Sequence, residues 1–162
     1  VILDLVHTAD LAINQALDLY SKPVCVSHAN VRTLVEGDRQ LSDSQIQKIA
    51  QRKGVIGIAL CNFMLKAGYS QNKLTREEVS LTHVAHHIDH ICQLVGNADC
   101  VGIGSDMDGG FGVDHIPKEL QTISDLPKLA DALHVRGFAD VDINKILIGN
   151  WTRFFAENLP AD

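Results

Sequence analysis

The sequence has few aromatic residues, no excess of basic residues and no long apolar run. Aromatic residues make up 5% of the 162 residues, and 14 basic against 20 acidic residues leave a net charge of -6. Nucleic-acid surfaces need clustered Lys and Arg, so we expect no nucleic-acid partner. Because no apolar run approaches the roughly 18 residues that span a bilayer, and no signal-type segment is visible, we expect no membrane segment in this chain and a cytoplasmic protein.

The sequence also lacks any C-x-x-C pair among its cysteines, which are Cys25, Cys61, Cys92 and Cys100. Three of the four lie in apolar, strand-like runs, where a free thiol behaves as a small hydrophobic side chain. We therefore expect free thiols in a reducing compartment, without disulfide bonds.

The remaining composition is that of an ordinary globular chain, with 46% apolar and 21% charged residues. At roughly 150 residues per domain, the length predicts a single region, residues 1–162. Residue 1 is Val, and Val1–Val6 is already a typical strand. We therefore expect the chain to be part of a longer protein.

Apolar runs alternate with segments of helical period along the whole chain. The predicted strands are Val1–Val6, Val24–Ser27, Val55–Leu60 and Cys100–Gly104. Strands that are apolar throughout and alternate with helices are typical of a parallel sheet, so the predicted fold class is α/β. A complete eight-unit barrel usually needs about 250 residues. Four units therefore indicate either a small doubly wound domain or half of a barrel.

Local signals mark several helix ends. Ser42 with Gln45, and Thr75 with Glu78, each fit the spacing of a capping box. The second box predicts the start of a long helix that carries four histidines. Gly54 follows the first of these helices and predicts its end, because glycine adopts the left-handed conformation of many helix ends easily.

Polar residues follow each predicted strand. His7, His28 and Asp106 follow the first, second and fourth strands, and Asn62 follows the third. The carboxyl ends of parallel strands form one rim, where ligands and catalytic groups gather. Two imidazoles and one carboxylate suit a zinc-type metal site, although a tetrahedral metal needs further ligands.

The long helix contains a second group of histidines, His83, His86, His87 and His90. On a helical wheel these four side chains point in different directions and cannot share one centre. The segment from His87 to Asp89 imitates an H-x-D metal motif, but it lies within a helix, away from the strand ends. We expect these histidines to be structural.

Two other readings concern the acidic residues. An EF-hand loop that starts at Asp106 would have Gly110 at its fifth position and no Glu at its twelfth, so an EF-hand is excluded. A strand followed by Asp-x-Asp-Gly is also found in phosphatases of the haloacid dehalogenase type, so phosphatase chemistry at Asp106 and Asp108 is an alternative. Asp4 lies within a strand, and we expect it to make a buried structural hydrogen bond.

Longer stretches resemble a known family. They are DLVHTAD, KPVCVSHANVR, GDRQLSDSQIQKIAQRKGVIGI, HHIDHICQLVG, CVGIGSDMDGGFG and ILIGNWTRFF. Together they resemble the membrane dipeptidase (renal dipeptidase) family of zinc peptidases, in particular its bacterial members. The resemblance implies a metal-dependent hydrolase of the amidohydrolase type, with a TIM-type (β/α)8 barrel, a binuclear zinc centre and dipeptide substrates. This chain would be the C-terminal half of that barrel.

The resemblance also implies roles for four residues. His7 and His28 match two histidine ligands of one zinc ion, and Arg39 matches an arginine that binds the substrate carboxylate. Asp106 matches a catalytic acidic residue that also contacts the substrate. Met107 stands where the family usually has an aromatic residue. The H-x-D pair, the carboxylate that bridges the two metals, and a further histidine belong to strands that precede this chain.

We therefore expect the parent protein to be a zinc-dependent metallo-dipeptidase and this chain alone to be inactive. A non-catalytic α/β fragment or binding module is the alternative from another class. Half a barrel exposes sheet edges, which favour self-pairing, so a homo-oligomer is also expected.

Overall fold

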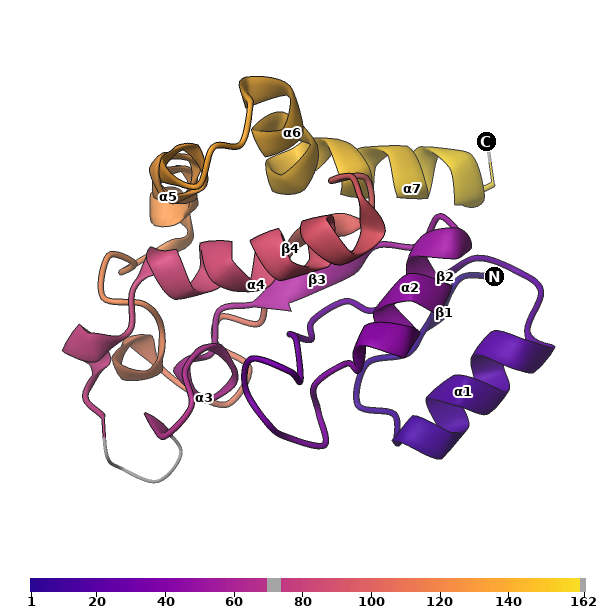
Figure 1. The fold of residues 1–162 in the computed structure, drawn as a ribbon, viewed down its shortest axis with the longest axis horizontal. Helices are drawn as coiled ribbons and strands as arrows, with labels where there is room; N and C mark the ends of the chain where they lie inside the picture. The colour runs from indigo at the N-terminus through magenta and orange to yellow at the C-terminus, as the bar shows by residue number, and fades with distance from the viewer. Residues whose placement is uncertain (70–73, 161–162) are drawn as a thin grey trace.

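The computed structural model describes residues 1–69 and 74–160, in which strands and helices alternate (Figure 1). The strands are β1 (Leu3–Asp4), β2 (Val24–Cys25), β3 (Ile56–Ala59) and β4 (Val101–Ser105). The helices are α1 (Asp10–Leu19), α2 (Asp43–Gln51), α3 (Asn62–Leu65), α4 (Leu81–Val95), α5 (Leu129–Val135), α6 (Asp140–Asn144) and α7 (Asn150–Asn158). A π-helical turn, Lys145–Gly149, joins α6 to α7. The predicted α/β class is confirmed.

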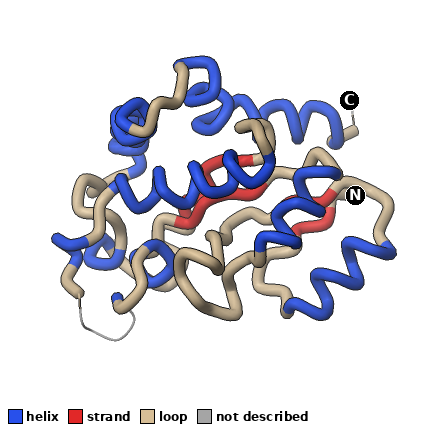
Figure 2. Tube along the Cα trace, viewed as in Figure 1, coloured by secondary structure: helices blue, strands red, loops and turns tan. Residues whose placement is uncertain are grey.

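The strands form two parallel pairs, β1 with β2 and β3 with β4 (Figure 2). A parallel bridge between Val26 and Ile56 connects the two pairs. Backbone bonds from Val26 N to Val55 O at 2.9 Å and from Gly57 N to Val26 O at 2.8 Å support it. The spatial order is therefore β1, β2, β3, β4, and the prediction of parallel strands is confirmed.

The strands β1, β2 and β3 are shorter than the apolar runs that predict them, whereas β4 has the predicted length and lies one residue later. Only Leu3–Asp4 of the predicted strand Val1–Val6 is a strand, although Leu5 N still donates to Cys25 O at 2.9 Å. The chain leaves the extended conformation at His7, whose φ is +57°. The apolar pattern indicates which residues are buried. The length of a strand depends instead on how many of its residues pair in register with a neighbouring strand.

The main hydrophobic core lies between the strands and the helices that follow them. Side chains of β2 and β3, such as Val24 and Ile58, contact the same core as Ile46 of α2 and Ile88 of α4, and all four are fully buried. The other face of the strands is tightly packed at glycines. A Cβ on either Gly57 or Gly104 would clash with the carbonyl oxygen of Ser27. These two glycines therefore allow the backbones of β2, β3 and β4 to approach closely.

Helix α7 covers the edge of β4 that faces away from β3. Ile56 N donates to Cys100 O, so by the alternation of a parallel ladder the carbonyls of Val101 and Ile103 point to the opposite edge. Asn150 Nδ2 donates to Val101 O at 2.7 Å, and Trp151 Nε1 donates to Ile103 O at 3.1 Å. Side chains therefore occupy acceptors that another strand would use, and the edge of β4 is less exposed than half a barrel predicts.

The helix ends confirm some local predictions and correct others. The capping box of Ser42 and Gln45 is present at the start of α2. The box of Thr75 and Glu78 exists but caps only the 3-10 turn Arg76–Glu78, and α4 begins separately at Leu81. A tertiary contact explains this break, because Leu81 N donates to the carboxylate of Glu119 at 3.1 Å.

The predicted role of Gly54 as a helix end is wrong. Lys53 carries the positive φ of +56° after α2, whereas Gly54 is not among the residues with positive φ. A Cβ at Gly54 would meet the carbonyl oxygen of Val24 at 2.6 Å. Glycine is needed there for space between the loop and β2, not for its conformation.

All four cysteines are free and buried, as the sequence predicts. Burial raises the pKa of Cys25 and Cys92 to about 12, which keeps both thiols protonated near neutral pH. Within residues 1–69 and 74–160, no helix is both long and apolar enough to cross a membrane.

Candidate active site

His7 and His28 meet at the carboxyl ends of β1 and β2. Leu3 of β1 pairs with Val24 of β2, an offset of 21 residues, and the two histidines are separated by the same number. Because spacing and register agree, both rings reach the same point. Their Nε2 atoms lie 3.1 Å apart, and the ring centroids lie 5.2 Å apart in an edge-to-face arrangement.

The backbone at this rim is turned into an unusual conformation. His7 and Asp106 both have φ of +57°, and Ser105 has φ of +52°. Such left-handed conformations cost a non-glycine residue about 1 kcal/mol or more, and they cluster at functional sites. The turn comes where each strand ends and directs the next side chain to the rim.

Arg39 and Asp106 complete the group. Arg39 Nη2 lies 2.7 Å from His7 Nε2, and Asp106 Oδ1 lies 3.8 Å from His28 Nε2. The four residues come from three separate strand ends and one loop. The structure thus brings together His7, His28, Arg39 and Asp106, the same residues that the sequence analysis selected.

The loop that carries Arg39 is held by two buried amides that the sequence analysis did not select. Gln40 Oε1 accepts from Asn30 N at 3.0 Å, and Gln40 Nε2 donates to Met64 O at 2.9 Å. Asn30 Nδ2 donates to Ala59 O at 3.1 Å. Both amides are almost fully buried, so they fix the loop to the end of β3. The only signal in the sequence is that they lie next to the site residues.

The hydrogen bonds of the two rings suit metal coordination. An arginine only donates, so His7 Nε2 is the acceptor of the bond from Arg39. His28 Nδ1 lies 3.0 Å from Ser27 Oγ, which can accept its proton and leave Nε2 free. Burial lowers the pKa of His28, while the nearby Asp106 carboxylate opposes this effect. A neutral imidazole is the form that binds metals.

The distance between the two nitrogens also fits a shared metal ion. Zinc–nitrogen bonds of about 2.0–2.1 Å in a tetrahedral site place two ligand nitrogens about 3.3 Å apart. The two Nε2 atoms of the histidine pair lie 3.1 Å apart. No group of three or more His, Cys, Asp or Glu in the described part of the chain could hold a metal ion, so the pair would be a partial site.

The histidines of α4 take no part in this group. Each has its own surroundings: His83 bonds to Ser80, His87 to Val31 and Leu65, His90 to Asp43, and His86 is exposed. They do not converge on one point. The interpretation as structural residues agrees with the contacts of His83, His87 and His90, and His87 is almost fully buried.

The other polar residues near the strand ends are less suited to catalysis. Asn62 is fully buried after β3, and its Nδ2 donates to Ile116 O at 3.1 Å. Asp108 is exposed, with φ of +71°. Met107 is partly buried and packs against the main core. The exposed position of Asp108 gives no support to the phosphatase alternative.

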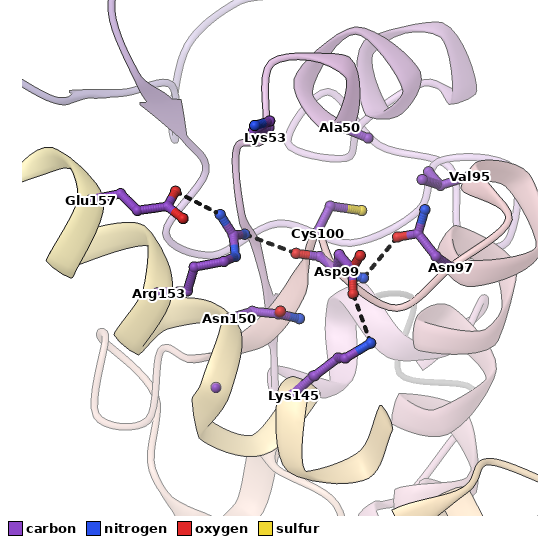
Figure 3. Close-up of a pocket in the computed structure, with 11 residues that line it drawn as sticks. Ala50, Lys53, Val95, Asn97, Asp99, Cys100, Lys145, Asn150, Arg153 and Glu157 are labelled. Carbon is purple, nitrogen blue, oxygen red and sulfur yellow. Dashed lines mark hydrogen bonds and ion pairs between the residues drawn. The ribbon is translucent and has the colours of Figure 1, made fainter. Parts of the chain in front are cut away.

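A cavity lies at the other end of the strands. It has a volume of about 590 Å³ and is lined by Lys53 and Cys100, which precede β3 and β4 (Figure 3). Two ion pairs lie in its lining, with Lys145 Nζ 2.9 Å from Asp99 Oδ1 and Arg153 Nη1 3.3 Å from Glu157 Oε2. The cavity is therefore separate from the histidine pair.

Comparisons with known proteins point to one family. The model of the family described as "Membrane dipeptidase (Peptidase family M19)" matches residues 1–160. Dipeptidase 3 of Mus musculus is 28% identical over 96% of this chain and 29% of its own length. An uncharacterized dipeptidase of Schizosaccharomyces pombe is 30% identical over 90% of this chain and 33% of its own length.

A solved structure supports the same assignment. A metallo peptidase from Rhodobacter sphaeroides, liganded with a phosphinate mimic of the dipeptide L-Ala-D-Ala, superimposes with a TM-score of 0.83 at 26% identity. The match covers 96% of this chain and 42% of that protein. The chain thus spans less than half the length of each of these three relatives. The family model covers nearly the whole chain, including the strand ends that carry His7 and His28. The chain therefore belongs to the membrane dipeptidase family.

Proposed function

We propose that this chain is the C-terminal half of a TIM-type (β/α)8 barrel in a zinc-dependent dipeptidase. Four parallel βα units in spatial order support half of such a barrel. The partial coverage of longer relatives supports a missing N-terminal half. The observation that carries the proposal is the pair of Nε2 atoms 3.1 Å apart, beside Arg39 and Asp106.

His7 and His28 would hold one zinc ion of a binuclear centre through their Nε2 atoms. When bound, zinc supplies a Lewis acid that lowers the pKa of water and polarises a peptide carbonyl. Burial lowers the pKa of His28, and the hydroxyl of Ser27 orients its ring. The remaining ligands would come from the N-terminal half.

Arg39 and Asp106 would act on the substrate. Arg39 presents a planar guanidinium at the rim, which can bind the C-terminal carboxylate of a dipeptide through two parallel hydrogen bonds. In this structure the guanidinium donates to His7 Nε2, and a zinc ion on that nitrogen would replace this bond and free the guanidinium for substrate. The Asp106 carboxylate would accept a proton from water and pass it to the leaving amine.

A dipeptide with a free carboxylate is the proposed substrate class. The Rhodobacter sphaeroides relative holds a mimic of L-Ala-D-Ala, which has such a carboxylate. This chain alone supplies two ligands and no bridging carboxylate. We therefore propose that it binds zinc weakly and hydrolyses no dipeptide without an N-terminal half.

Zinc competition against a chromophoric chelator tests the metal site on the chain itself. The wild-type chain should bind zinc, and His28→Ala should weaken binding by about a hundredfold, because one of two ligands is lost. His86→Ala is the matched control, since His86 is exposed on α4, and it should bind zinc as the wild type does. Equal affinities for all three proteins would contradict the proposed site.

Activity assays on the parent protein, with both halves, test the roles of the other residues. Arg39→Ala should keep the zinc content and lose activity on dipeptides with a free carboxylate. Arg39→Lys should restore little, because an ammonium group lacks the planar fork. Asp106→Asn should bind substrate but turn over slowly, and full activity of this variant would exclude the proton-transfer role.

A further inference from the structure

Asp4 connects the two strand ends that carry the histidines. Its Oδ1 accepts a hydrogen bond from Val6 N at 3.1 Å and another from Ser27 N at 3.0 Å. Val6 directly precedes His7, and Ser27 directly precedes His28. The structural hydrogen bond expected of Asp4 is therefore present, but the side chain is exposed rather than buried.

The strands provide little other support at this point. The ladder of β1 and β2 contains two residue pairs, Leu3 with Val24 and Asp4 with Cys25, and Leu5 N adds one further bond to Cys25 O. Beyond it, β1 turns away at His7. The Asp4 carboxylate oxygen accepts hydrogen bonds from the segments that follow both strands. It therefore connects these two segments beyond the end of the ladder. Hydrogen bonds to a charged acceptor are stronger than neutral ones.

The contacts of Asp4 distinguish it from a surface carboxylate. No ion pair involves Asp4 among residues 1–69 and 74–160, whereas Asp10, Asp18 and Asp89 each pair with a basic side chain. Its hydrogen bonds go to two backbone amides that lie 21 residues apart in the chain. Such bonds fix the distance between two segments, and here those segments end in the histidine rings.

We propose that Asp4 is a positioning residue that holds the rings of His7 and His28 at the separation needed to bind one metal ion. The proposal rests on the proposed zinc site, but the separation of the two rings can be measured independently of zinc binding. An acceptor at the position of Oδ1 is the required feature. Asparagine can provide it, alanine cannot, and glutamate would place it one methylene too far.

Two measurements on the 162-residue chain test the proposal, with Asp4→Ala, Asp4→Asn and Asp4→Glu as variants. The first is the nuclear Overhauser effect between the rings of His7 and His28 in metal-free protein. It should be present in the wild type and Asp4→Asn, because the ring centroids are 5.2 Å apart. It should weaken strongly in Asp4→Ala and Asp4→Glu.

The second measurement is the zinc dissociation constant. Partners that orient metal ligands typically contribute about 10- to 100-fold to metal affinity, so Asp4→Ala and Asp4→Glu should bind about tenfold more weakly. Asp4→Asn should stay within about threefold of the wild type, since only the charge is lost. Urea unfolding separates these effects from a loss of fold, and Asp4→Glu keeps the test possible if Asp4→Ala does not fold.

The outcomes separate this proposal from the proposed function. If Asp4→Ala keeps both the ring contact and the zinc affinity, Asp4 has no positioning role. If Asp4→Asn loses affinity as Asp4→Ala does, charge rather than the hydrogen bonds is responsible, and the proposal is again wrong. If the ring contact depends on Asp4 but the wild type binds no zinc, the positioning role holds and the metal site fails.

Discussion

Six of the eight histidines of this chain lie in two regions, at the ends of β1 and β2 and along α4. On α4 all four lie between residues 83 and 90, yet each has different surroundings. At the strand ends they are 21 residues apart, yet their Nε2 atoms are 3.1 Å from each other. Close spacing in sequence is therefore a poor indication that histidines share a site. Equivalent positions on neighbouring parallel strands are a much better indication.

The two regions also differ in the partners of their imidazole nitrogens. Val31 N donates to Nδ1 of His87 and Nε2 of His87 lies 3.3 Å from Leu65 O, so both nitrogens of this buried ring are used. The Nε2 atoms of His7 and His28 instead face each other and the side chains of Arg39 and Asp106. The ring on α4 joins segments of the fold, whereas the Nε2 atoms at the strand ends contact other residues of the candidate site.

The largest predicted effect comes from removing the buried ring. His87→Ala should lower the free energy of unfolding by about 4 kcal/mol, because it leaves a cavity and an unpaired Val31 N–H. Urea unfolding at pH 7.5 measures this effect. His86→Ala is the control and should change stability by less than about 0.5 kcal/mol. Similar values for the two variants would remove the distinction between a structural and an exposed histidine on α4.

The free energy of unfolding should also fall at acid pH because of His87. Burial lowers the pKa of His87 from 6.5 to about 4. Below pH 6.5 the unfolded chain takes up a proton that the folded chain does not, so stability is complete above pH 6.5 and falls down to about pH 4. The loss should be about 3 kcal/mol, measured by urea unfolding across this range. His87→Gln should reduce the dependence of the unfolding free energy on pH between 6.5 and 4. An unchanged dependence in this variant would show that other groups cause it.

At the strand ends, a smaller effect should come from the hydroxyl beside His28. Ser27→Ala removes the group 3.0 Å from His28 Nδ1. Zinc affinity should fall about tenfold, because the ring loses the partner that fixes its tautomer. Chelator competition measures the change, with Ser124→Ala at an exposed position as the control. A metal affinity equal to that of the wild type would show that Ser27 does not orient the ring.

The smallest effect concerns the contact between α4 and α2. His90 Nε2 lies 2.9 Å from Asp43 Oδ1, with both side chains partly exposed. A double-mutant cycle with His90→Ala and Asp43→Ala should give a coupling energy of about 0.5 kcal/mol, because solvent screens such pairs. A coupling above about 2 kcal/mol would place His90 with His87 as an essential connection of the fold.

Much of the architecture could be predicted because it depends on local patterns. Alternating apolar runs and helical segments predict the order of the elements, and the Ser42 capping box marks the start of α2 correctly. Predictions failed where a distant contact decided the structure. Leu81 N bonds to Glu119, so α4 starts later than the Thr75 box indicates. Gly54 lies against Val24 O, so space rather than conformation explains the glycine.

The sequence by itself determined which residues reach the rim. His7, His28 and Asp106 follow apolar strands, and parallel strands bring such positions to one end of the sheet. The tertiary structure decided how they meet. The 21-residue register, the left-handed turns at His7 and Asp106, and the bonds of Asp4 place the rings 3.1 Å apart. These features depend on contacts between residues far apart in the chain, which only form once the strands have paired.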